Sequence, residues 1–384
     1  MNQNLLSQQD SINVALANRI RQLQADGQTI CQLQTGDPDF DTPAFIIQAA
    51  CYAMQHGDTH YCASSGKQQL KQAICTKLMK DNAINVQPSE VLVTQGAVHG
   101  LYLALQGILN RADEVIVIAP YWMPYYANIV LAGAKPVVLE THLVDDYAID
   151  INQLQRLITK RTKAIIINSP NNPTGKILNR AELTRIGDLA VANNLYIIAD
   201  EVYEQLVFQG QHFSIQALYP DYPNIISLFS FSKSFAMTGW RIGYLVANTD
   251  VVNQLNKLTQ YISTSVSPFI QAGAHAALVH EQSASVRQQM LTIYQQRLTH
   301  IIEQLDDSWA RQQYYLPQGT FYLFINVSDK TASARQLVEH LLMEQQCAFT
   351  PGVAFGAGYD QYIRMTFASS LADINTGLSV LRGL

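Results

Sequence analysis

Short apolar runs alternate with longer amphipathic segments along the middle of the chain. The runs are rich in Val, Ile and Leu and are bounded by turn residues; they cover 90–94, 114–120, 135–140, 163–170, 195–200 and 224–232. Their length and their lack of polar alternation are typical of strands that are buried on both faces. The segments between them, such as 96–109 and 180–194, carry apolar residues at helical spacing. This alternation predicts an α/β fold with a mostly parallel sheet that is covered by helices on both faces.

The last part of the chain has a different pattern. Strand-like runs at 319–328 and 362–369 enclose a helical segment at 333–345, and a further helix closes the chain. This pattern is typical of a smaller α+β domain. Residues 1–45 are expected to join it, because they carry only one helix and a loop. We therefore predict a large domain over 46–280 and a small domain formed by 1–45 together with 281–384.

Composition and charge exclude several classes of protein. A formal net charge of -5 provides no basic surface for nucleic acid or for an anionic membrane, and no apolar run reaches membrane-spanning length. The five cysteines are odd in number and show no Cys-x-x-Cys spacing, which speaks against a disulfide framework or a zinc site. The N-terminal segment lacks the features of a signal peptide. We expect a cytoplasmic enzyme that binds no metal, no nucleic acid and no membrane.

The carboxyl ends of the predicted strands carry the candidate chemistry, because ligands bind at these ends in open α/β sheets. After the first strand the chain passes through Gly96 into a helix, where backbone N–H groups and the helix dipole would favour a phosphate. The strand at 163–170 runs into "NSPNNPTGK", in which Asn172 offers both a donor and an acceptor. An ordinary strand–helix turn and an ordinary Asn/Pro loop are the alternatives to these two interpretations.

Asp200 ends a wholly apolar strand in "IIADEVYEQL". A carboxylate in that place is costly unless a cation or a strong donor meets it. The alternative is that Asp200 caps a following helix. Such a helix would place Tyr203 on the same face as Asp200, so that its hydroxyl reaches the same ligand.

Lys233 follows an apolar strand in "SLFSFSKSFAMTGWRIG". A lysine sheltered at a strand end loses its proton readily and forms a Schiff base with an aldehyde. Arg241, in the same motif, would clamp a phosphate with its planar fork. Trp122 in "APYWMPYY" also follows a strand end and would cover an aromatic ring. Taken singly, these residues have ordinary alternatives, namely a surface lysine, a surface ion pair and a core tryptophan.

Taken together, these side chains match a single ligand. It would carry a phosphate, a basic ring nitrogen, a phenolic oxygen, an aldehyde and a flat face. The phosphate would meet Gly96, Ser230 and Arg241, and the ring nitrogen would meet Asp200. The phenolic oxygen would meet Asn172 and Tyr203. The aldehyde would react with Lys233, and the flat face would lie against Trp122. Pyridoxal 5'-phosphate has all of these groups, so the sequence predicts a site for this cofactor.

Three motifs also carry a resemblance to a known family. "NSPNNPTG", "ADEVY" and "SFSKSFAMTGWRIG", in this order and spacing, resemble fold-type I, class I/II pyridoxal-phosphate aminotransferases, in the branch of bacterial aspartate, aromatic and methionine aminotransferases. The likeness runs from "QTGDPDFDTP" near the start to "YIRMTFASS" near the end. It implies a mostly parallel seven-stranded-type central sheet in the large domain, a smaller α+β domain, and pyridoxal 5'-phosphate as cofactor.

The resemblance implies how the matching residues treat the cofactor. Lys233 would hold it in a Schiff base and move the substrate proton, and Asp200 would keep its ring nitrogen protonated. Asn172 and Tyr203 would bind its ring oxygen, and Trp122 would cover the ring. The phosphate would be held by Gly96, Ala97, Val98, Ser230, Ser232 and Arg241.

The resemblance also implies how substrate and a second subunit are bound. Arg364, helped by the Gly36 backbone, would bind the substrate α-carboxylate, and Trp122 and Asn172 would contact the substrate as well. Tyr61 matches the family tyrosine that reaches the phosphate in the partner subunit, which implies a homodimer.

Substrate choice depends on one departure from the family pattern. Members that act on acidic substrates resemble "GGKQAL" where this chain has "GAVHGL", so their lysine falls on Val98. Without that cation, a second substrate carboxylate would be buried unpaired. We therefore expect a neutral, apolar or aromatic L-amino acid, favoured over aspartate, to exchange its amino group with a 2-oxo acid by a ping-pong mechanism. His99 or a group of the partner subunit is the alternative source of a cation.

Two other functions are compatible with the same motifs. A pyridoxal-phosphate-dependent β-lyase that cleaves C–S bonds uses nearly the same residues. A non-catalytic regulatory module that binds the cofactor without turnover would keep the same fold. The presence of Lys233, Asp200 and Arg241 together favours an enzyme over such a module.

Overall fold

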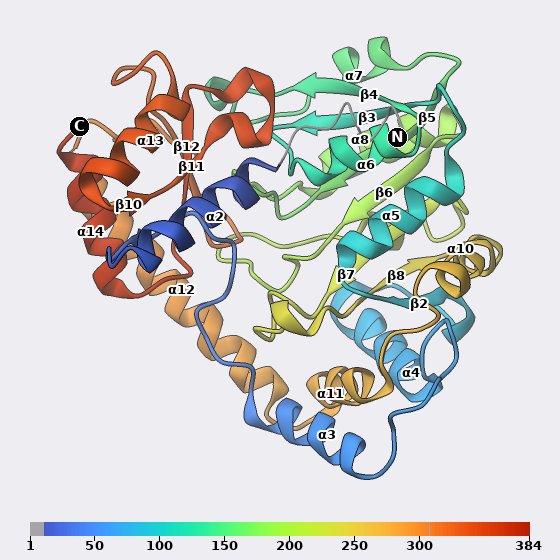
Figure 1. Cartoon of the computed structure of the whole chain (residues 1–384). Helices are drawn as coiled ribbons and strands as arrows, with labels where there is room; N and C mark the ends of the chain where they lie inside the picture. Colours follow the sequence, from blue (N-terminus) through green and yellow to red (C-terminus); the bar gives the residue numbers. More distant parts are fainter. Residues whose placement is uncertain (1–10, 307) are drawn as a thin grey trace.

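A seven-stranded sheet forms the centre of the structure, a computed structural model that describes residues 11–306 and 308–384 (Figure 1). Its strands are β2 (Val91–Thr94), β3 (Glu114–Ala119), β4 (Lys135–Glu140), β5 (Thr162–Asn168), β6 (Tyr196–Asp200), β7 (Ile225–Ser230) and β8 (Gly243–Ala247). They lie in the order β2-β8-β7-β6-β5-β3-β4. β8 runs antiparallel to β2 and β7, and the other neighbours pair in parallel. The predicted mostly parallel α/β sheet is confirmed.

β8 is the strand of the seven-stranded sheet that the sequence pattern did not predict. It begins just after Arg241, inside a motif that was interpreted for its chemistry, and its five residues are too few to show a period. All five residues are buried, because β8 lies between β2 and β7 in the interior of the sheet. Its place in the sheet, rather than its local sequence, identifies it as a strand.

Helices cover both faces of the sheet, and successive residues of a strand point to opposite faces. On β5, Ile165 packs in one apolar cluster and Ile166 in another. The helices of this part of the chain are α3 (Ala44–Gln55), α4 (Gln68–Lys77), α5 (Ala97–Ile108), α6 (Pro124–Leu131), α7 (Ile151–Leu157), α8 (Arg180–Ala192), α9 (Ile215–Leu218), α10 (Thr249–Ile262) and α11 (Pro268–Val279). Within the described ranges, no helix is both long and apolar enough to pass through a bilayer.

Residues 308–384 form a smaller unit beside the large sheet, drawn in orange and red in Figure 1; it is called the C-terminal unit below. Its antiparallel sheet has the order β11-β12-β9. The elements are β9 (Tyr322–Asn326), α13 (Ala334–Gln345), β10 (Cys347–Ala348), β11 (Thr350–Pro351), β12 (Tyr362–Thr366) and α14 (Leu371–Arg382). The long α12 (Ser283–Asp306) precedes it.

The N-terminal segment is attached to the C-terminal unit. β1 (Cys31–Gln32) pairs in parallel with β10, and α2 (Ile12–Ala25) contributes Ile20 and Leu23 to an apolar cluster that includes Leu342 and Ala348. This pairing carries the chain that follows β1 past the carboxyl ends of the large sheet. The domain boundaries at 45 and 280 stay a prediction.

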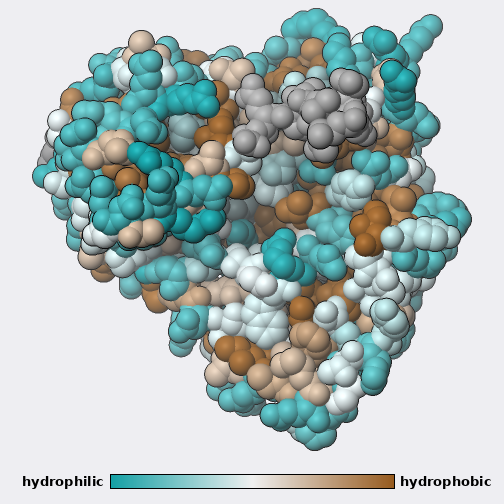
Figure 2. All heavy atoms as spheres, in the orientation of Figure 1, coloured by the Kyte–Doolittle hydropathy of each residue, from teal (hydrophilic) through white to brown (hydrophobic). Residues whose placement is uncertain are grey.

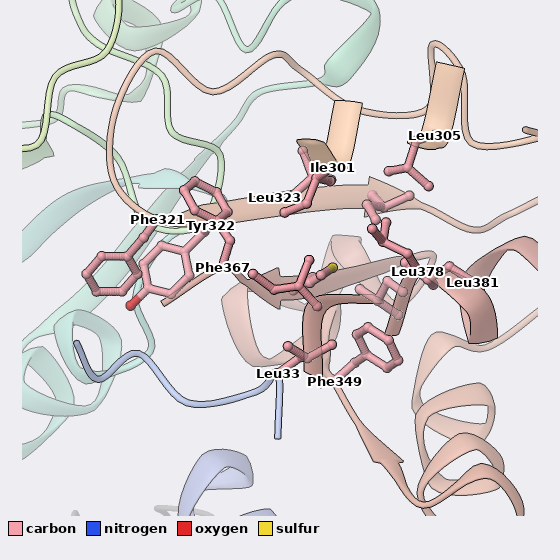
Figure 3. Close-up of a cluster of buried hydrophobic side chains, with 14 of the residues drawn as sticks. Leu33, Ile301, Leu305, Phe321, Tyr322, Leu323, Phe349, Phe367, Leu378 and Leu381 are labelled. Atoms are coloured by element: carbon pink, nitrogen blue, oxygen red, sulfur yellow. The ribbon is translucent and has the colours of Figure 1, made fainter. Parts of the chain in front are cut away.

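An aromatic core in the C-terminal unit determines where one polar group of the site lies. Phe321, Tyr322 and Phe367 are fully buried in a cluster with Leu33 (Figure 3). The Tyr322 hydroxyl points away from this cluster and lies 2.9 Å from the hydroxyl of Tyr203. Packing of the C-terminal unit therefore places a phenol next to a residue that follows β6.

The helix expected after Asp200 was a wrong prediction, because residues 202–205 form turns. Two glutamates of this segment are bound by buried polar side chains from elsewhere, Glu201 by Ser214 and His212, and Glu204 by Lys77 and Asn82. Such side-chain bonds hold a turn in place without a helical ladder. Tyr203 reaches the site from this turn instead of from a helical face.

Candidate active site

A cavity of about 430 Å³ opens at the carboxyl ends of β5, β6 and β7. Figure 2 shows the hollow between the C-terminal unit, at the left, and the rest of the molecule. The predicted site residues that line it are Gly36, Ala97, Val98, Trp122, Asn172, Asp200, Tyr203, Ser230, Ser232, Lys233, Arg241 and Arg364. Gly96 lies against the Arg241 guanidinium at its edge, whereas Tyr61 does not line it and is 90% exposed.

One end of the cavity is built to hold an anion. Gly96 has a φ of 78° and precedes α5, and a side chain there would collide with Arg241, whose Nη2 lies 2.5 Å from the position of a Cβ. Arg241 is fixed by the bond from its Nη1 to the Thr238 carbonyl at 2.9 Å. The N–H groups at the start of α5 and this guanidinium therefore face the same space, to which Ser230 adds a hydroxyl.

Asp200 lies at the end of β6 and is buried. Burial raises the pKa of its carboxyl to about 6, although hydrogen bonds from Tyr125 and from the Val202 N–H act in the opposite direction. The Tyr125 hydroxyl donates to Asp200 Oδ2 at 2.6 Å. A cationic ligand group at this carboxylate would favour its ionised form.

Tyr125 is one of the site residues that sequence reasoning missed. It occurs in the quoted "APYWMPYY" motif, three residues after Trp122, and was not separated there from its aromatic neighbours. In the structure it is buried, lines the cavity, and meets Trp122 edge-on at a centroid distance of 5.6 Å. The only signal in the sequence was its position after the end of β3.

Lys233 lies just beyond β7 with its amine in the cavity. The amine donates to the Gly36 carbonyl at 2.5 Å. Burial lowers the pKa of Lys233 to about 8, and the nearby Asp37 carboxylate acts in the opposite direction. Near neutral pH a larger fraction of Lys233 is therefore neutral than of an exposed lysine, and the neutral amine is the better nucleophile and base.

The lowered pKa of Lys233 predicts the pH dependence of cofactor uptake. Only the neutral amine attacks an aldehyde, so the rate at which cofactor-free protein attaches pyridoxal 5'-phosphate covalently should rise about ten-fold per pH unit and level off above about pH 8. An amine with the ordinary pKa of about 10.4 would give a rate that rises to about pH 10. Stopped-flow absorbance across pH 6–11 measures this, and a profile that levels off only near pH 10 would contradict it.

Arg364 stands on β12 with its guanidinium buried and aimed into the cavity. Its Nη1 donates to Asn172 Oδ1 at 3.0 Å and its Nη2 donates to the Gln34 carbonyl at 2.7 Å, whereas its buried Nε has no partner in the described structure. The Tyr322 ring lies 4.1 Å from the guanidinium carbon. A fixed guanidinium with donor capacity left over is suited to bind a carboxylate.

The sequence of the chain matches the family model described as Aminotransferase class I and II over residues 28–381. The chain belongs to this family. The aspartate aminotransferase of Bacillus sp. (strain YM-2) is 39% identical over 368 residues, which are 94% of this chain and 93% of that relative. The aromatic-amino-acid aminotransferase 2 of Thermococcus litoralis is 34% identical, over 89% of this chain and 88% of its own length.

Solved structures of the aminotransferase family show the same fold over the whole chain. The aspartate aminotransferase of Thermus thermophilus with maleate has a TM-score of 0.94 and 31% identity, and the match covers 100% of this chain and 99% of that one. The aromatic aminotransferase of Pyrococcus horikoshii has a TM-score of 0.89 at 32% identity, over 95% and 98% of the two chains. The protein is an aminotransferase, and its cofactor is pyridoxal 5'-phosphate.

The residues of the cavity fit this cofactor. The Gly96 cradle, which a Cβ would fill, and Arg241 suit its phosphate, and the buried carboxylate of Asp200 suits its ring nitrogen. The amine of Lys233, with its pKa lowered to about 8, suits its aldehyde. A buried carboxylate, an anion site and an amine in one cavity are the set of groups that the cofactor requires.

Proposed function

We propose that this aminotransferase moves the amino group between a neutral, apolar or aromatic L-amino acid and a 2-oxo acid by a ping-pong mechanism, and that aspartate is a poor donor. The observation that carries the proposal is the lining of the cavity. Val98, 37% exposed, lies in the first turn of α5, at the position to which the family resemblance assigns a lysine in members that act on acidic substrates. The names of relatives include both aspartate and aromatic substrates, so the residues of this cavity are the better guide.

The charges of the cavity support this choice of substrate. Among the described residues that line it, the three cations are Lys233, Arg241 and Arg364. In this proposal each of them binds the cofactor or the substrate α-carboxylate. Asp37 also lines the cavity and accepts a hydrogen bond from Thr238 Oγ1 at 2.6 Å. A second substrate carboxylate would therefore meet a carboxylate rather than a free cation, which disfavours it.

In the proposed reaction, Arg364 binds the substrate α-carboxylate and orients the Cα–H bond. The neutral amine of Lys233 takes the proton from Cα and returns a proton later in the same half-reaction. Pyridoxal 5'-phosphate, when bound, accepts the electron pair left at Cα and stores the amino group between the half-reactions. Tyr203 and Asn172 would bind its ring oxygen, and Trp122 would cover its ring.

The second half-reaction uses the same groups in the opposite direction. The first 2-oxo acid has to leave before the second enters, because both carboxylates use Arg364. Initial-rate plots at several acceptor concentrations should accordingly give parallel lines. Release of pyruvate and ammonia from cystathionine without any oxo acid would instead indicate the β-lyase.

The substrate preference predicts the outcome of a donor panel. With 2-oxoglutarate as acceptor, we expect kcat/KM for methionine and phenylalanine to exceed that for aspartate by at least about ten-fold, since one buried unpaired carboxylate costs about 1–3 kcal/mol. Val98→Lys should raise kcat/KM for aspartate by about ten-fold or more and lower the values for the apolar donors. Val98→Leu, which adds bulk without charge, is the matched control. A wild-type value for aspartate well above the other two would contradict the proposal.

We also propose that two copies form the active unit, with Tyr61 of each copy reaching the phosphate in the other. In support, Tyr61 and Tyr261 are 90% and 91% exposed, and Tyr52 on the nearby α3 is 63% exposed. Large aromatic side chains this exposed are enriched at sites of protein contact.

A further inference from the structure

Asp200 is a buried carboxylate that meets a single side-chain donor within the described ranges. Tyr125 donates to Oδ2 at 2.6 Å, and the other oxygen, Oδ1, is 3.2 Å from the Val202 backbone N–H. None of the ion pairs among residues 11–306 and 308–384 includes Asp200. A buried carboxylate without a cation depends on such donors to stay ionised.

Tyr125 is itself rigidly placed. It lies in the first turn of α6, where its backbone N–H donates to the Trp122 carbonyl at 3.0 Å, and it is 2% exposed. Its ring packs in the apolar cluster that contains Ile166 and Ile198, on one face of the large sheet. The hydroxyl is therefore held toward Asp200 by the core, and it needs no reorganisation to act.

The surroundings of Asp200 oppose its charge. Burial has the largest effect and raises the pKa of Asp200, and the carboxylate of Glu201, the next residue, acts in the same direction. Tyr125 and the Val202 N–H act against them, whereas Lys233 has the weakest effect. Without the hydrogen bond from Tyr125, a larger fraction of Asp200 would be neutral. A neutral carboxyl does not stabilise a protonated ring nitrogen.

We propose that Tyr125 is a positioning residue for the reaction: its hydroxyl orients Asp200 toward the cofactor ring nitrogen and keeps that carboxylate ionised. The inference rests on the proposed role of Asp200. Tyr125 acts through Asp200, and two oxygens of one carboxylate leave acceptor capacity for the ring nitrogen beside the bonds from Tyr125 and Val202. A purely structural tyrosine would stabilise the core around Trp122, and its loss would affect the binding of a cofactor equally with or without the ring nitrogen.

A pair of cofactors separates these two roles. Pyridoxal 5'-phosphate has the ring nitrogen that Asp200 would hold, and its analogue with C–H in place of that nitrogen does not. The Kd of cofactor-free protein is measured for both compounds in the wild type, in Tyr125→Phe and in Tyr121→Phe. Tyr121 is the matched control, because it is also buried, belongs to the same segment, and stacks on Tyr126 without a bond to Asp200.

The expected result is a selective loss. Tyr125→Phe should raise the Kd for pyridoxal 5'-phosphate about ten- to hundred-fold, which is the effect of a hydrogen bond to a buried charge, and leave the Kd for the analogue within about two-fold. Tyr121→Phe should change neither Kd by more than about two-fold. If Tyr125→Phe does not fold, Tyr125→Leu replaces it, because this variant also removes the hydroxyl donor. Its Kd should rise for pyridoxal 5'-phosphate and not for the analogue.

Two results would overturn the inference, and they are distinguishable. If Tyr125→Phe weakens the binding of both compounds equally, or of neither, Tyr125 has only a packing role, and the proposed role of Asp200 is not affected. If the wild type binds both compounds equally well, the role of Asp200 itself fails, and the role of Tyr125 fails with it. Neither result depends on the choice of amino-acid substrate.

Discussion

Replacing Lys233 by alanine is expected to lower kcat at least about 10⁴-fold for every amino donor. In the proposed reaction this lysine would supply both the nucleophile that anchors the cofactor and the base that moves the Cα proton, and loss of a base alone costs about 10²–10⁴-fold. The variant should still bind pyridoxal 5'-phosphate, because Arg241, the start of α5 and Asp200 do not depend on Lys233. Steady-state rates and an absorbance spectrum after borohydride treatment measure both effects.

The control for this variant is an exposed lysine. Within residues 11–306 and 308–384, Lys257 on α10 bonds only to Gln254 on the surface, so Lys257→Ala should leave kcat and the borohydride-fixed cofactor unchanged. If Lys233→Ala kept more than about 1% of the wild-type kcat, or still fixed the cofactor covalently, another amine would have to be the anchoring residue.

Arg364→Lys is expected to lower kcat/KM about 10²–10³-fold for all amino acids and oxo acids alike. Lysine keeps the charge but not the planar fork, so it cannot bond Asn172 and the Gln34 carbonyl while it also binds a carboxylate. Loss of one or two charge-assisted bonds of about 1.5–3 kcal/mol each corresponds to roughly 10- to 10⁴-fold, and the expected loss lies in the middle of that span. Rates with methionine, phenylalanine and their oxo acids test it, because every one of these substrates carries the same α-carboxylate.

Arg297 offers a matched control for Arg364. It is also buried and forked, with bonds to both oxygens of Asp39 at 2.7 and 2.6 Å, but it does not line the cavity. Arg297→Lys should lower thermal stability while kcat/KM stays within a few-fold of the wild type. An Arg364→Lys variant that lost stability but kept kcat/KM would show that Arg364 is structural.

The chemistry at individual strand ends could be predicted from sequence because it is local. Asn172, Asp200 and Lys233 each follow an apolar run that ends abruptly, and a parallel sheet brings the carboxyl ends of its strands to one edge. The short β8 and the turn after Asp200 could not be predicted in this way. β8 is defined by the two strands beside it, and the turn is held by side chains from α4 and from the 212–214 segment.

The α/β class, the aminotransferase family and the cofactor could be predicted from the amino-acid sequence alone, because each of the motifs that indicate them is a continuous segment at the end of one strand. Which distant side chains meet could be learned only from the folded chain. Tyr125 and Asp200 are 75 residues apart and stand on either side of β5, and Arg364 meets Asn172 across 192 residues. Such contacts depend on strand order and on how the C-terminal unit packs against the large sheet, and these are properties of the whole fold rather than of any local segment.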